Sequence, residues 1–537
     1  MKRSVLLGLL VAMAPAVQVL NAGSAPVTLT VQSYRALTNA VVQVVDTVAP
    51  GSAGMWLADL REGLGISGLE GIDLDRPWQL AVWLEGTQGS PSISVRIPTT
   101  DFEAFKAGLA SGSILSGFNQ PEAVRPAGDY ANIWIQTGAA SGASESAHAA
   151  WKPADLAPAG TVLGLEIKPG DPLREQILGA LAMVRMMVVG MMVEQGQNVP
   201  GVDAQAMSEL MGAYFDVAQV ALRGLETLKL GLDVRGDEIT LTETVTAKSN
   251  SELASWLDAG EGSLDSVIGY ASTDLPLAMA MRWDRATAGF MPTLKKFARL
   301  SLQLQGVAAS DDAVTQMEEL LDAAIPMRFG GGLDFSEGFI FSGVYQFPGR
   351  DLGRIHELMR RYFEGPMQQQ VGGDQLYKSI SFKEGARKVD SVPVDRVTME
   401  LNLESPLYEV PGQKEMIERM WPGGRMVIDQ ARRGDRWFMG SPAALDRLLA
   451  GAPTAQPVVP ASLNPHTVLF GRVNLLKLLP AMLEGNPMVP DEAAAQLRRA
   501  DSAGTEMTLQ IDLTGSALIA RSVVPLKLLR SVAQAMQ

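Results

Sequence analysis

The most distinctive side-chain chemistry in this sequence is a concentration of methionine in one stretch. Residues 177–193 are apolar except for Arg185. Closely spaced thioethers could bind Cu(I), but such a site normally includes a histidine or cysteine, and none is near in the sequence. Methionine more often fills irregular cores or lines adaptable apolar grooves. We therefore expect this stretch to be a packed helix, and an apolar ligand or partner surface is the alternative. The candidate surface consists of Met183, Arg185, Met186, Met187, Met191 and Met192.

A transmembrane role for this stretch is disfavoured by its length and by its charge. It is shorter than a typical span, and a central arginine costs about 2.5–3.5 kcal/mol on insertion scales. If Arg185 is buried it needs a carboxylate partner, and Glu194 and Asp203 are the nearest candidates in the sequence.

No catalytic, cofactor-binding or metal-binding motif is complete. The only histidines are His148, His356 and His466, and cysteine is absent, so zinc ligands would have to converge from distant parts of the chain. Residues 63–68 match G-x-G-x-x-G by letter, but a helix is predicted before them, where a dinucleotide site needs a strand. We therefore assign no catalytic residue, no cofactor and no metal.

Two further patterns have an ordinary structural interpretation. Asp73 and Asp75 could contribute to a calcium site, but they lack the other oxygen ligands of a calcium loop. Residues 235–237 and 433–435 each spell Arg-Gly-Asp between alternating apolar runs. Gly-Asp in such a position is typical of a hairpin turn, so we expect turns here and not adhesion sites.

Composition and the N-terminus indicate an exported, acidic protein. The chain has 45 Lys and Arg against 59 Asp and Glu, a formal charge of −14, which disfavours binding to nucleic acid. Lys2 and Arg3 precede an apolar stretch to Leu20, and small residues follow. This is the pattern of a cleavable signal peptide over residues 1–24. We expect a periplasmic or secreted protein without a transmembrane segment after cleavage.

One order of elements recurs along the chain: a strand, two helices, a β-hairpin and a closing helix. It is predicted within residues 25–152, 160–260, 270–451 and 462–537, and we interpret these four stretches as domains. The first carries extra strands, the second the methionine-rich helix and the third an extra sheet segment. Hairpins imply antiparallel pairing, so the expected class is α+β, with antiparallel sheets covered by helices.

These observations favour an exported, non-enzymatic binding or scaffold protein whose partner is a protein or an apolar ligand. One alternative is a carrier of apolar ligands or lipids that uses a groove at the methionine-rich helix. Another is a carboxylate-based hydrolase whose residues meet only in the folded chain.

Overall fold

The structure is a computed structural model, and it forms two compact units. It describes residues 27–535, apart from 65–68, 86–89, 110–123, 137–160, 197–203, 259, 261, 272–274, 305–310, 335–338, 372–374, 406–412, 451–462, 464 and 484–490. The first unit consists of Met1–Ala182, Leu225–Ala247 and Val523–Gln534, and the second of Met183–Gly224, Lys248–Ser522 and Ala535–Gln537. The four domain boundaries drawn from the sequence remain a prediction.

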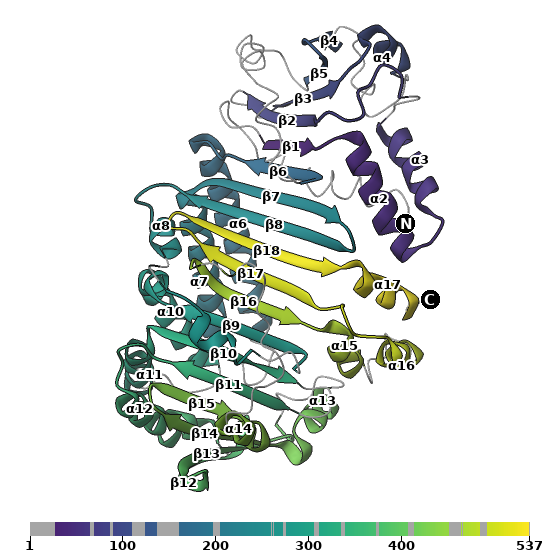
Figure 1. Cartoon of the computed structure of the whole chain (residues 1–537). Helices are drawn as coiled ribbons and strands as arrows, with labels where there is room; N and C mark the ends of the chain where they lie inside the picture. Colours follow the sequence, from purple (N-terminus) through teal and green to yellow (C-terminus); the bar gives the residue numbers. More distant parts are fainter. Residues whose placement is uncertain are drawn as a thin grey trace. The chain divides into compact units, whose positions relative to one another are not determined.

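The predicted order of elements is confirmed in all four stretches (Figure 1). The first contains β1 (Val27–Val31), α2 (Tyr34–Val48), α3 (Ala53–Leu64), β2 (Trp78–Glu85), β3 (Ser90–Pro98) and α4 (Phe102–Gly108), then β4 (Val124–Pro126) and β5 (Tyr130–Gln136). The second contains β6 (Leu163–Ile167), α6 (Asp171–Gly196), α7 (Ala204–Gly224), β7 (Leu225–Arg235), β8 (Glu238–Ala247) and α8 (Glu252–Leu257), followed by the short α9 (Asp265–Ile268).

The third and fourth stretches follow the same plan. The third contains β9 (Leu277–Trp283), α10 (Arg285–Leu304), α11 (Asp311–Ala324), β10 (Met327–Asp334), β11 (Ile340–Gln346) and α12 (Leu352–Glu364). Its extra segment contains β12 (Tyr377–Val389), β13 (Val392–Leu401), α13 (Gln413–Met420), β14 (Arg425–Arg433), β15 (Arg436–Gly440) and α14 (Pro442–Leu449). The fourth contains β16 (Thr467–Val473), α15 (Leu475–Leu483), α16 (Asp491–Arg499), β17 (Met507–Leu513), β18 (Ala517–Pro525) and α17 (Leu526–Ala535).

Several helices begin at residues whose side chains cap them. Ser441 occupies the N-cap position of α14, with Pro442 in the first turn, but its side chain makes no capping hydrogen bond. The sequence predicts capping boxes that begin at Thr100 with Glu103 and at Ser249 with Glu252, and both caps are displaced. Asp101, not Thr100, accepts the first amides of α4, and Ser251, not Ser249, caps α8. In each case the residue nearer the helix has the extended backbone that a cap requires.

Within each unit the strands pair antiparallel. The first unit has the order β4-β5-β3-β2-β1-β6-β7-β8. The second has the order β12-β13-β14-β15-β11-β10-β9-β16-β17. This is the α+β class expected from the hairpins.

In the second unit, helices cover both faces of the strands around β11 and β15. Leu445 of α14 packs with Val344 and Phe438 on one face. On the other face, Ile355 of α12 packs with Phe347 and Trp437. Because alternate residues of a strand point to opposite faces, β15 contributes Phe438 to one core and Trp437 to the other.

Small residues allow α9 to approach the strands of the second unit closely. Gly330 lies opposite Ala280, and Gly332 opposite Ala278, so the four lie on one face. Val267 of α9 packs with both alanines there. A Cβ on Gly330 would lie 1.9 Å from the Val267 carbonyl oxygen, which leaves room only for glycine.

None of the helices in the described part of the chain has the length and apolar character needed to cross a membrane.

Candidate functional site

The methionine-rich helix α6 presents most of its described methionines to solvent. The exposed fractions are 68% for Met183, 71% for Met186, 58% for Met187 and 46% for Met191. At helical spacing these four lie on one side, which we call the methionine face. The Met192 side chain lies outside the described residues. The expectation of a packed helix is therefore wrong for the methionine face, and the alternative of an exposed apolar surface is the one that fits.

The opposite side of α6 faces the protein. Leu178 is buried, and Ile177 packs against the core cluster of Val27 and Val82. Both sides of the helix are thus apolar, although only one is covered. A helix that is apolar all round is normally buried, so the exposure of one side of α6 is unusual.

Arg185 anchors α6 to α7 by an ion pair. Its Nη1 lies 2.8 Å from Oδ1 of Asp216, and Lys296 of α10 lies 2.8 Å from Oδ2 of the same carboxylate. The sequence predicts a carboxylate partner for Arg185 if this residue is buried. Its side chain is 38% exposed, and it pairs with Asp216, which is distant in sequence. Glu194 and Asp203 have side chains outside the described residues.

Asp216 stays ionised between its two cations. Partial burial acts to raise its pKa, but hydrogen bonds and attraction from Lys296 and Arg185 outweigh burial and lower the pKa. Gly212, one turn earlier in α7, lies beside the same guanidinium, where a Cβ would be 3.2 Å from Arg185 Nη2. These contacts link α6 to α7.

A second apolar surface lies on the sheet of the first unit. Leu232 lies opposite Leu163 on β6 and Leu241 on β8, and Leu230 lies opposite Leu165. These leucines therefore share a face, yet each is only partly buried, and Leu241 is 47% exposed. The helices of this unit leave part of an apolar sheet face open to solvent.

The structure also brings together a buried pair that the sequence did not indicate. His356 of α12 and Asp395 of β13 are each 6% exposed, and His356 Nε2 lies 2.8 Å from Asp395 Oδ2. The other carboxylate oxygen accepts a hydrogen bond from the Gly385 amide at 2.8 Å. The rings of Phe382 and Trp437 lie 5.8 and 5.9 Å from the imidazole. A hydrolytic triad would place a hydroxyl on the second imidazole nitrogen, and the described neighbours of the ring are aromatic instead.

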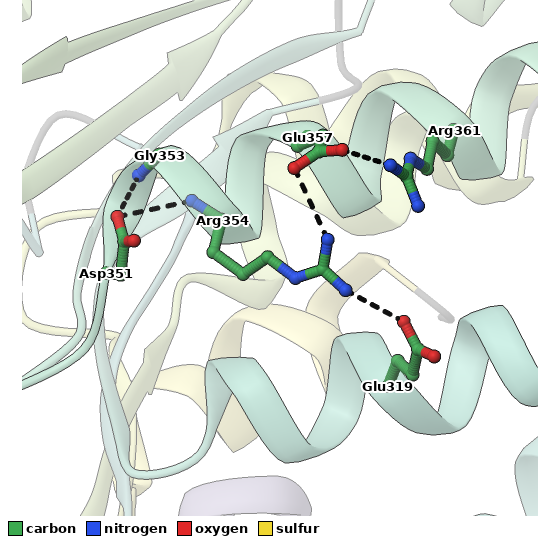
Figure 2. A network of polar contacts seen from close by, with 6 residues as sticks. All are labelled: Glu319, Asp351, Gly353, Arg354, Glu357 and Arg361. Carbon is green, nitrogen blue, oxygen red and sulfur yellow. Dashed lines mark hydrogen bonds and ion pairs between the residues drawn. The ribbon is translucent and has the colours of Figure 1, made fainter.

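The opposite side of α12 holds this helix in place (Figure 2). Asp351 caps it by accepting from the Gly353 amide at 2.8 Å. Arg354 bridges Glu319 of α11, at 3.0 Å, and Glu357, which also pairs with Arg361. These exposed pairs contribute little singly. The buried side of the same helix carries Ile355, His356 and Leu358.

Acid is expected to destabilise the second unit partly through Asp395. Burial raises the pKa of this carboxyl, but hydrogen bonds from His356 and the Gly385 amide outweigh burial, so the net pKa is lowered. A lowered pKa means that the stabilisation is complete above the unfolded value, near 4, and is lost as the pH falls through the folded value. Urea midpoints measured between pH 6 and 2 should therefore fall less steeply for Asp395→Asn. Asp312→Asn, on the exposed side of α11, should follow the wild type, and identical slopes for all three would contradict this role.

The remaining motifs have structural roles. Gly63 lies inside α3, so a helix precedes the G-x-G-x-x-G pattern, and its last residues lie outside the described part. Asp75 pairs with Arg35 at 2.6 Å, and Asp73 accepts a hydrogen bond from the Asp75 amide. His148 lies outside the described residues. Within the described part, no three His, Asp or Glu side chains are grouped as metal ligands would be.

Both Arg-Gly-Asp sequences form hairpin turns, as predicted. Gly236 and Gly434 have φ of 56° and 63°, the left-handed values that such turns require. In the second turn, Asp435 accepts from Gln346 at 2.6 Å and Arg433 donates to the Leu449 carbonyl. These intramolecular bonds occupy the side chains that an adhesion receptor would need.

Comparisons of the chain with protein-family models, with curated proteins and with solved structures find no match. The functional argument therefore rests on the geometry of this chain alone.

Proposed function

We propose that this protein is an exported, non-enzymatic binding protein that holds an apolar partner or ligand on the methionine face of α6. The observation that supports the proposal is the exposure of four methionines, 46–71% each, on one side of a helix anchored by Arg185 and Asp216. Methionine is unbranched and polarisable, so its side chain adapts to partners of different shape.

The anchoring contacts fit a binding surface. A flexible side chain loses rotamer entropy when it binds, and a rigid helix limits that loss to the side chains themselves. The ion pair of Arg185 with Asp216 holds the backbone of α6 relative to α7, so only the methionines need to adjust. The signal-peptide pattern supports a location outside the cytoplasm, and that location belongs to the proposal.

A carrier of apolar ligands or lipids is the second candidate. The partly exposed leucines on β6, β7 and β8 favour it, because displacement of water from a leucine-lined sheet face by an acyl chain is favourable in free energy.

No such observation favours a hydrolase. The described carboxylates with a resolved pKa shift all have a lowered pKa: Glu166, Asp216 and Asp429 pair with Lys or Arg, and Asp395 is hydrogen-bonded to His356 and the Gly385 amide. A general acid needs a raised pKa instead.

The test compares two matched variants of the methionine face. Changing Met183, Met186, Met187 and Met191 together to glutamine keeps the length and helix propensity of the side chains but makes the face polar. Changing the same four to leucine keeps the face apolar. Native mass spectrometry of each protein, purified from its own host, should show a bound partner or lipid on the wild type and the leucine variant. The glutamine variant should have lost most of it.

Equal retention by the glutamine variant would reject the methionine face as the binding site. A lipid retained by that variant but lost from Leu230→Gln would support the carrier and assign binding to the sheet face. Circular dichroism serves as the control, since all variants should keep the wild-type helix content.

A further inference from the structure

The described methionines differ strongly in how accessible their sulfur atoms are. The sequence has 26 methionines and no cysteine, so thioethers are its only side-chain sulfur. Five described methionines are exposed, and four of these form the methionine face, while Met55 of α3 is 47% exposed. By contrast, Met317 and Met399 are 9% and 6% exposed, inside separate cores.

We propose that the methionine face is a site of oxidative modification by hydrogen peroxide. A thioether sulfur attacks the terminal oxygen of the peroxide, the O–O bond breaks, and a sulfur–oxygen bond forms. The sulfur is oxidised by two electrons and the peroxide is reduced to water, so atoms and electrons balance without a further reactant. In proteins that contain cysteine, thiolates compete for such oxidants, and this chain has none.

Oxidation here would change the surface without unfolding the helix. The four side chains lie outward, and the contacts that hold α6 are made by other residues, Leu178 on its covered side and Arg185 to Asp216. A sulfoxide is polar and accepts strong hydrogen bonds, so the face loses its apolar character. The same chemistry at Met317 or Met399 would disrupt a core, and burial protects both.

The consequence for binding rests on the proposed function. If an apolar partner occupies the methionine face, sulfoxide formation weakens its binding, and an occupied face protects the four sulfurs from oxidant. Binding and oxidation are then mutually exclusive on one surface.

The experiment treats the full-length purified protein with graded hydrogen peroxide and measures the oxidation of each methionine by peptide mass spectrometry. Met183, Met186 and Met187 should react severalfold faster than Met317 and Met399, and Met55 provides the rate of an isolated exposed methionine. The temperature of unfolding should stay unchanged while these three are oxidised. Similar rates at exposed and buried positions, or oxidation of α6 only after unfolding, would overturn the modification site.

A second readout separates the modification from the proposed function. Fluorescence of the apolar probe 8-anilinonaphthalene-1-sulfonate, added before and after oxidation, should fall in the wild type and stay constant in the fourfold leucine variant. Selective oxidation with unchanged probe fluorescence would keep the modification site and reject the binding face. If the fourfold glutamine variant loses probe fluorescence but the wild type is not oxidised selectively, the binding face is kept and the modification site is rejected.

Discussion

Replacing Gly330 with alanine is expected to destabilise the second unit by about 3 kcal/mol, because a well-packed core accommodates an added methyl only by moving its neighbours. The added Cβ would meet the Val267 carbonyl oxygen at 1.9 Å and its carbon at 2.7 Å. Both are backbone atoms of α9, so no side-chain rotation can relieve the clash. The helix has to move away from β10, and its packing against Ala278 and Ala280 is lost.

Gly190→Ala is the matched control for this change. It adds the same methyl in the same unit, but Gly190 lies in α6 with nothing within 4 Å of the built Cβ. There alanine is expected to stabilise the helix by about 0.8 kcal/mol. Urea unfolding followed by circular dichroism should move the two midpoints in opposite directions. Equal midpoints would show that α9 does not depend on a glycine beneath it.

The second large effect is expected from Asp429, which is fully buried between two arginines. Arg396 Nε lies 2.6 Å from Oδ1, and Arg387 Nε lies 2.7 Å from Oδ2. Burial raises the pKa of Asp429, but the hydrogen bonds from Arg396 and Arg387 outweigh burial and lower the pKa, so the carboxylate remains charged. Asp429→Ala leaves two guanidinium groups without their shared partner. It should cost about 3 kcal/mol, the range seen when one member of a buried ion pair is removed.

Two further variants locate the origin of that loss. Asp446 also pairs with Arg387, but its side chain is 47% exposed, so Asp446→Ala should cost less than about 1 kcal/mol. Asp429→Asn keeps the shape and removes the charge, and it should fall between the two alanine variants. The order of the three urea midpoints is the measurement. A midpoint for Asp429→Ala as high as that for Asp446→Ala would mean that the buried pair adds nothing to stability.

The repeated order of elements was predictable from local patterns. Alternating apolar residues, helical periodicity and turn residues such as Gly236 and Gly434 act over a few neighbours, so they can be recognised without the fold. Capping residues were less predictable, because Thr100 and Asp101 both have side chains able to cap, and only the backbone conformation selects one of them.

The candidate site was predictable in composition and not in exposure. The sequence identified α6 as the unusual helix, but a helix that is apolar on every side carries no pattern to say which side is covered. The structure shows which side is exposed, and it pairs Arg185 with Asp216, 31 residues away. The pairing of His356 with Asp395, 39 residues apart on a helix and a strand, had no sequence signal either.

The sequence by itself therefore determined the repeating α+β plan, the antiparallel hairpins and the methionine content of α6. Only the tertiary structure decided that the methionines point outward, that α9 lies directly on Gly330, and that Asp429 lies between two arginines. The physical reason is the distance along the sequence over which each effect acts. Propensity, periodicity and turn chemistry depend on adjacent residues, whereas exposure and ion pairing depend on which distant segments the folded chain brings into contact.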